Sequence, residues 1–187
     1  MSYLTYIASD YPLPIVKNPH DKLLSVNEAL ALGVEDIPDI LMVPDFDRDK
    51  PEVILYSDRE VVFDINRKEI RDGGFADDFA LLQAEGMEDI YSEKKYKVYL
   101  EWNYYTVERA DQVIEYIRDN LFHTDEVEIW RIWMGAAEKP TIRSKKVPIS
   151  KLRGEDIRKL EEKDLLGESD ELHGLPVQYR LLVIKER

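Results

Sequence analysis

Residues 95–105, KYKVYLEWNYY, alternate between two sets of side chains, which is the period of a β-strand with one buried face. Residues 107–121 follow with apolar side chains at helical spacing, and Thr106 before them is a suitable N-cap. Burying each large apolar side chain contributes about 1.5–3 kcal/mol, whereas the like-charge pairs of this segment cost only about 0.3 kcal/mol each. We therefore expect a strand followed by an amphipathic helix.

Three more strands and one more helix are predicted in the second half of the chain. The strands are expected at 126–134, 141–149 and 176–185, and the helix begins at Gly154. The resulting order, β-α-β-β-α-β, is the succession of a ferredoxin-like fold. That topology places the third strand inside the sheet, whereas its lysines and Pro148 suit an edge.

The first half of the chain is less regular. Residues 3–8 are a candidate strand, and Ser25 with Glu28 forms a capping box before a short helix. Residues 52–65 are expected to form two strands around a turn, and residues 74–86 a helix. We expect an α+β protein with a ferredoxin-like C-terminal half packed against this smaller N-terminal α+β lobe.

Charge divides the chain at the same place. Residues 1–90 carry 8 basic and 20 acidic side chains, for a net charge of −12, and residues 91–187 carry 18 and 19, for a net charge of −1. The predicted lobes are therefore an acidic one at 1–90 and a nearly neutral one at 91–187, unless the two form one continuous domain. A negative field repels phosphates, so it argues against nucleic acid or an anionic membrane and favours a cationic partner.

Composition excludes several kinds of chemistry. The chain has no cysteine, which rules out disulfides, thiolate catalysis and iron–sulfur clusters. No cofactor is expected, because neither a phosphate-binding glycine loop nor a nucleophile elbow is present. The first ten residues lack a basic segment followed by an apolar one, and no apolar run is long enough to span a bilayer. We expect a cytoplasmic protein.

Asp45, Asp47 and Asp49 stand at alternate positions before an apolar run. An EF-hand loop starting at Asp45 would need glycine at its sixth position and glutamate at its twelfth, where this chain has Lys50 and Tyr56. Aspartate is also common in turns, because its side chain bonds to nearby backbone groups. The triplet is interpreted mainly as a solvated turn, and a metal site completed by a distant carboxylate is the alternative.

Histidine offers one further candidate for catalysis. His123 is expected at the turn between the 107–121 helix and the next strand, where an imidazole can also serve a structural role near the helix C-terminus. The basic stretch 143–153 is interpreted as a lysine-protected edge strand, and an anion-binding patch is its alternative.

One face of the predicted C-terminal sheet is a candidate protein-binding surface. Aromatic and polar side chains alternate there, and Trp130 and Trp133 must point to opposite faces of an unbulged strand. The alternative is that the N-terminal lobe covers this face. The candidate surface consists of Tyr99, Glu101, Asn103, Arg131 and Trp133.

Together these patterns favour a non-enzymatic cytosolic binding or regulatory protein that presents an acidic surface to a cationic protein partner. The alternative is a carboxylate- or metal-dependent, hydrolase-like enzyme centred on Asp45, Asp47 and Asp49 or on His123. A self-associating scaffold is a third hypothesis, since the sequence does not specify the oligomeric state.

Overall fold

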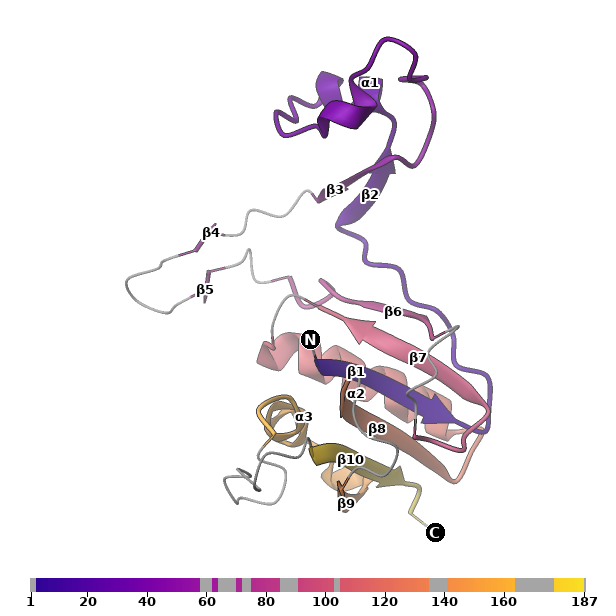
Figure 1. Ribbon diagram of the computed structural model, residues 1–187. Helices are drawn as coiled ribbons and strands as arrows, with labels where there is room; N and C mark the ends of the chain where they lie inside the picture. The colour runs from indigo at the N-terminus through magenta and orange to yellow at the C-terminus, as the bar shows by residue number, and fades with distance from the viewer. Residues whose placement is uncertain are drawn as a thin grey trace. The chain divides into compact units, whose positions relative to one another are not determined.

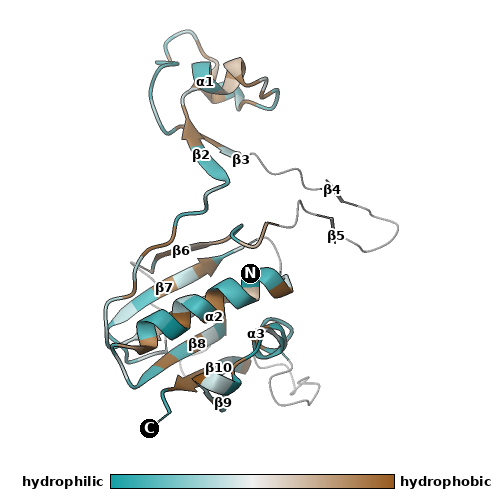
Figure 2. Cartoon of the chain, turned by 180° about the vertical axis from the view of Figure 1, so that it is seen from behind, coloured by the Kyte–Doolittle hydropathy of each residue, from teal (hydrophilic) through white to brown (hydrophobic). Residues whose placement is uncertain are grey.

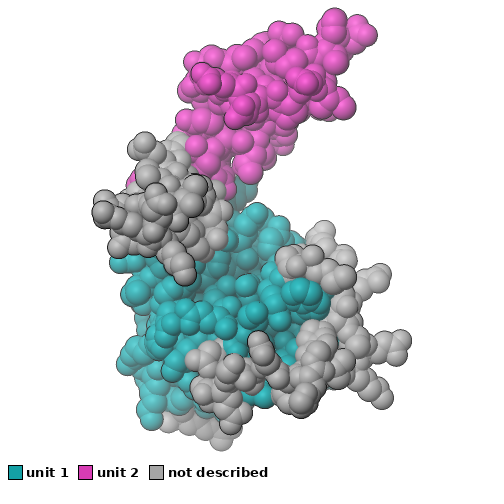
Figure 3. All heavy atoms as spheres, turned by 60° about the vertical axis from the view of Figure 1, so that its left-hand side comes forward, with its two compact units in different colours: residues 1–17, 76–187 teal, residues 18–75 magenta. Residues whose placement is uncertain are grey.

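The chain falls into two compact units. The computed structural model describes residues 3–57, the backbone of 62–63 and 70–71, and residues 75–84, 91–102, 105–134, 141–163 and 177–186. Unit 1 comprises residues 1–17 and 76–187, and unit 2 comprises residues 18–75 (Figure 3). None of the helices in the described part of the chain has the length and hydropathy needed to cross a membrane.

Unit 1 is built on a six-stranded sheet (Figure 1). The strand order is β6-β7-β1-β8-β10-β9, and every neighbouring pair is antiparallel except β10 with β9. The strands are β1 (Tyr3–Ser9), β6 (Ala80–Gln83), β7 (Tyr96–Glu101), β8 (Glu126–Trp133), β9 (Thr141–Pro148) and β10 (Val177–Ile184).

Strand β1 lies inside this sheet and is buried on both faces. Tyr6, Ile7 and Ala8 have no exposed surface. Ile7 pairs with Val98 of β7 and with Ile129 of β8, so these three side chains share one face, and Tyr6 points to the other. The strand expected at residues 3–8 is confirmed, and it belongs to the same sheet as the strands of the second half.

Helices α2 (Val107–Leu121) and α3 (Gly154–Glu161) cover the Ile7 face of the sheet. Helix α2 lies behind the sheet in Figure 1 and in front of it in Figure 2, where its hydrophobic and hydrophilic residues alternate along the ribbon. The Thr106 hydroxyl caps α2 by accepting from the Arg109 backbone N–H, as the sequence predicts. A 3₁₀ turn, η2 (Ile149–Lys151), precedes α3.

The α+β class is confirmed, but the ferredoxin-like arrangement of residues 91–187 is not, because the strand order differs. Strand β9 lies at the sheet edge, β10 lies between β8 and β9, and β1 separates β7 from β8. Since β1 runs antiparallel to both β7 and β8, the segment β7-α2-β8 is a split β-α-β unit around a strand from the other end of the chain. The lysines and Pro148 of β9 are tolerated because an edge strand has a hydrogen-bonded neighbour on one side only, and lysine and proline are common on such strands.

Unit 2 is small. Its elements are β2 (Asp21–Leu24), α1 (Val26–Ala31), the 3₁₀ turn η1 (Asp39–Leu41), β3 (Ile54–Ser57), β4 (Val62–Phe63) and β5 (Ile70–Arg71). The predicted capping box is present, because the Ser25 hydroxyl accepts from Glu28 N–H and the Glu28 carboxylate accepts from Ser25 N–H. The buried core of the described part of this unit is formed by Val26, Ala29 and Ile54.

Two predictions for the first half need correction. The helix expected at 74–86 is wrong, because β6 pairs with β7 and places Leu81 opposite Leu100 in the core. A short apolar run is compatible with a strand and with a helix. Here it forms a strand because it hydrogen-bonds to β7. Residues 52–65 do contain two strands, but β3 pairs with β2 and β4 with β5.

The compact units also group the chain differently from the predicted lobes of 1–90 and 91–187. Strands β1 and β6, both from the first ninety residues, lie in the large sheet. The predicted boundary at residue 90 lies outside the described residues.

A buried ion pair holds α2 to the segment before β6. Arg109 Nη2 donates to Asp78 Oδ2 at 2.7 Å, and the two side chains are 0% and 1% exposed. Removing one partner of such a pair is costly, because the other charge stays in a poorly solvated site.

We expect Asp78→Ala to lower the free energy of unfolding of the full chain by about 3–5 kcal/mol, measured by urea denaturation, because it removes a buried carboxylate partner of the Arg109 guanidinium. Asp111→Ala removes an exposed carboxylate from the same helix and should change stability by less than about 0.5 kcal/mol. Equal effects of the two substitutions would contradict the assigned role.

Candidate functional site

The strand register separates the predicted binding residues onto two faces. Tyr99 and Trp130 are both opposite Tyr6 of β1, so they share the face away from the helices, and Glu101 lies on that face too. Arg131 pairs with Thr5 and lies on the helix-covered face, as does Trp133. The opposite parity of Trp130 and Trp133 is confirmed, and Asn103 lies outside the described residues.

The face away from the helices carries its own buried cluster of Tyr6, Ala8, Trp130 and Ile132. The Tyr6 and Trp130 rings are stacked, with centroids 5.9 Å apart and planes at 6°. Tyr91, from the segment before β7, packs against the same cluster. The centre of this face is therefore a second core rather than an exposed aromatic surface.

Glu128 is a mostly buried carboxylate beside that cluster. Its Oε2 accepts from Trp130 Nε1 at 2.8 Å and from the Ser92 hydroxyl. Its Oε1 faces Arg180 Nη1 at 3.3 Å, and the Arg180 guanidinium also lies over the Trp130 ring, 5.3 Å from its centroid. Because both oxygens are occupied by donors, Glu128 is better suited to hold Trp130 and Arg180 in place than to act as a general base.

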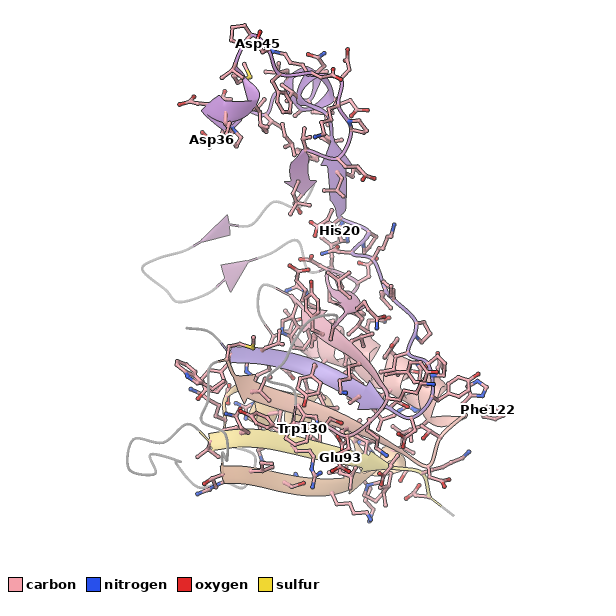
Figure 4. The ribbon with its side chains drawn as sticks, turned by 45° about the vertical axis from the view of Figure 1, so that its right-hand side comes forward. His20, Asp36, Asp45, Glu93, Phe122 and Trp130 are labelled. Carbon is pink, nitrogen blue, oxygen red and sulfur yellow. The ribbon has the colours of Figure 1, made fainter. Side chains whose placement is uncertain are left out.

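A groove of about 540 Å³ runs over this network, and Figure 4 labels Glu93 and Trp130, which line it. Lys94 Nζ bridges Asp10 at 2.6 Å and Glu126 at 2.7 Å on its wall. Burial lowers the pKa of the Lys94 ammonium, but the two carboxylates outweigh it and raise the pKa overall. The cations of this groove are thus neutralised within unit 1.

A second pocket, of about 360 Å³, gathers most of the predicted binding residues despite their different faces. Tyr99, Glu101 and Arg131 line it. Trp133 reaches it indirectly, by an edge contact of 4.8 Å between ring centroids with Tyr3, which is also in the lining. Three of the five predicted residues thus line one pocket, and their role in binding a protein stays a prediction.

The three aspartates form a hydrogen-bonded turn in unit 2. Asp47 Oδ1 accepts from the Asp49 backbone N–H at 3.1 Å, and Asp49 Oδ1 accepts from Asn27 Nδ2 at 2.7 Å. Asp45 is exposed (Figure 4). In the described part of the chain, no group of three His, Cys, Asp or Glu side chains is placed to hold a metal ion.

The aspartate turn is part of a longer acidic loop, residues 33–53, between α1 and β3. Exposed apolar side chains lie among its acids: Ile40 is 74% exposed, and Val43 is also exposed. Within the part of unit 2 that the structure describes, Asp36 and Asp45 lie at the end away from His20 (Figure 4). The carboxylates of five exposed acids of this loop have no hydrogen bond or ion pair with described residues: Glu35, Asp36, Asp39, Asp45 and Glu52.

His123 lies in an exposed aromatic cluster at the C-terminal end of α2. Its ring stacks on Tyr11 with centroids 4.4 Å apart and touches Phe122 edge-on at 5.3 Å. Among the described residues, no carboxylate hydrogen-bonds to the imidazole. This arrangement gives His123 a packing role and does not place it beside a catalytic partner.

Comparisons with family models, with curated proteins and with solved structures each gave no match for the chain.

Sequence reasoning missed the Glu128 network and the pair of Arg109 with Asp78. A signal for the first was present: Glu128 has the same parity as Trp130 and Ile132 and so had to face the same core. For the second there was none, because Asp78 sits in a segment that was expected to be a helix.

Burial raises the pKa of the Tyr6 hydroxyl well above its usual range, although the Ser92 and Tyr91 backbones partly offset this. The unfolded chain loses this proton near pH 10 while the folded chain keeps it. The contribution of Tyr6 to the free energy of unfolding is therefore fully present below about pH 10. Above that pH it decreases by about 1.4 kcal/mol per pH unit.

We expect Tyr6→Phe to remove that part of the slope, so the difference in unfolding free energy from the wild type changes by about 1.4 kcal/mol per unit above pH 10. Urea denaturation between pH 9 and 11.5 measures it. Parallel curves for the two proteins would show that Tyr6 ionises in the folded state.

Proposed function

We propose that the chain is a non-enzymatic binding or regulatory protein whose unit 2 recognises a cationic protein partner. Unit 2 carries 14 acidic and 7 basic residues, for a net charge of −7. Fields of this sign speed the encounter with a basic protein and disfavour phosphate-bearing partners. Nucleic acid is therefore not the proposed partner, and the cytoplasmic location stays a proposal from the sequence.

The observation that carries the proposal is the combination of unpaired acids and exposed apolar side chains on loop 33–53. Ile40 and Val43 are exposed beside acids without a cation among the described residues. On the neighbouring β2–β3 ladder, Leu23 faces Leu55 and both side chains are exposed. A partner segment with both basic and apolar side chains would satisfy this surface, since acids supply selectivity and buried apolar area supplies affinity.

A carboxylate- or metal-dependent enzyme has less support. The Asp47 and Asp49 carboxylates already accept hydrogen bonds, Glu128 is surrounded by donors, and His123 stacks on Tyr11 and touches Phe122 edge-on. The hypothesis would need several acidic or imidazole groups around one cavity. The described residues supply no such group of metal ligands.

The experiment is affinity capture of lysate proteins on the immobilised full chain at increasing salt. The loop variant replaces Asp36, Asp39, Asp45 and Glu52 by the corresponding amides. A matched control neutralises four exposed acids of α2, Glu108, Asp111, Glu115 and Asp119, and so changes the net charge equally.

We expect one or more basic proteins to be retained at 50 mM NaCl and released by 300 mM, because screening weakens contacts between exposed charges. The loop variant should lose them and the α2 control should keep them. Retention by the loop variant, or retention that ignores salt, would sink the proposal.

Replacing Ile40 by Ser tests the apolar half of the surface. The side chain is 74% exposed, so its loss should leave the melting temperature unchanged while weakening binding of the captured partner about 10-fold, which calorimetry measures. An unchanged affinity would show that Ile40 does not contribute and that the partner is recognised through charge alone.

A further inference from the structure

Strands β1 and β7 part before their ends and form a fork in the sheet of unit 1. Their pairing begins at Thr5 with Leu100, whereas β1 pairs with β8 as far as Tyr3 with Trp133. Tyr3 and Leu4 are therefore held on the β8 side and have no ladder partner on β7. The pocket of about 360 Å³ lies at this fork, and a volume of that order suits a small ligand.

The walls of the fork pocket are aromatic. Tyr3 of β1, Tyr99 of β7 and Trp102, which directly follows β7, line it. Trp102 is steadied by an edge contact with Tyr105 at 6.2 Å, and Tyr3 by its contact with Trp133. Tyr3 lies on the helix-covered face and Tyr99 on the other, so the rings border the pocket from both faces of the sheet, and they favour a flat apolar body because aromatic pairs gain energy beyond area burial.

Two polar residues of the pocket, Arg131 and Glu101, have hydrogen-bonding capacity that the described residues leave unused. The Thr5 hydroxyl donates to Glu161 Oε1 and accepts from Arg131 Nη1 at 2.8 Å. Glu161 Oε2 faces Arg131 Nη1 at 3.1 Å. Thr5 and Glu161 are thus satisfied, whereas Arg131 Nε is buried without an acceptor. A ligand that binds the Arg131 guanidinium must bring an acceptor, and it must also tolerate the Glu101 carboxylate, which has no partner among the described residues.

We propose that the fork pocket binds a small aromatic carboxylate, with the ring between the aromatic walls and the carboxylate on Arg131. The Arg131 side chain is 21% exposed, so the ligand meets the exposed nitrogens of the planar guanidinium, while Nε stays buried. Lys163, whose Nζ lies 4.5 Å from the Tyr3 ring centroid, adds a second positive charge. Glu101 and Glu161, both in the lining, oppose the ligand, and Glu161 already pairs with Arg131 at 3.1 Å. This site is in unit 1 and does not depend on the function proposed for unit 2.

The probes are phenylacetate and its neutral counterpart phenylacetamide, which have the same ring and nearly the same shape. Binding to the full chain is followed by tryptophan fluorescence at pH 7, with Trp102→Phe identifying the reporter. We expect phenylacetate to bind at least 10-fold more tightly than phenylacetamide. Equal affinities, or a response that survives Trp102→Phe unchanged, would overturn the proposal.

Glu101→Gln should tighten phenylacetate binding about 3-fold by removing a nearby repulsive charge and leave phenylacetamide unchanged. Glu93→Gln, the matched control, neutralises an exposed glutamate at the other groove and should change neither. Arg131→Lys keeps the charge without the planar donor edge and should weaken phenylacetate binding at least 10-fold.

If Arg131→Lys does not fold, as its circular dichroism would show, the Glu101→Gln and Glu93→Gln pair still decides. A gain that only Glu101→Gln produces supports the fork pocket. No gain, or the same gain from both, contradicts it.

Discussion

The burial of β1 between β7 and β8 is the constraint on which the rest of unit 1 depends. Both of its faces are enclosed, with Ile7 under the helices and Tyr6 in the Trp130 cluster, so the two cores share one strand. That strand comes from the start of the chain, and its sheet neighbours come after residue 95. Unit 2 is an excursion between β1 and β6, which costs little, because loop-closure entropy grows only slowly with loop length.

The elements that could be predicted are those whose determinants are local. Helix α2 follows from its spacing and from Thr106, and α1 from the reciprocal bonds of Ser25 and Glu28. The topology could not be obtained in that way, because strand pairing depends on partners distant in sequence. The composition of β9 did hold the missing information: its lysines and Pro148 favour an edge, and β9 lies at the edge.

The candidate sites depended on a register that only β1 supplies. Without a strand between β7 and β8, nothing in the sequence decides whether Tyr99 shares a face with Trp130 or with Arg131. Tyr6 pairs with both Tyr99 and Trp130 and so decides for the first. Arg131 and Tyr99 nevertheless line the same pocket, which lies where the pairing of β1 with β7 ends and is bordered by residues of both faces.

The two units treat their charges differently. In unit 1, Asp78, Lys94 and Glu128 each bond to a fixed partner, and removing water from such groups is tolerable only when they are satisfied. In loop 33–53, several carboxylates are exposed to solvent and have no partner among the described residues. Charged side chains that are paired within the fold contribute to its stability, whereas those without a partner are available to bind another molecule. By the same reasoning Arg131, the pocket residue with an unused donor, is where unit 1 has capacity left for a ligand.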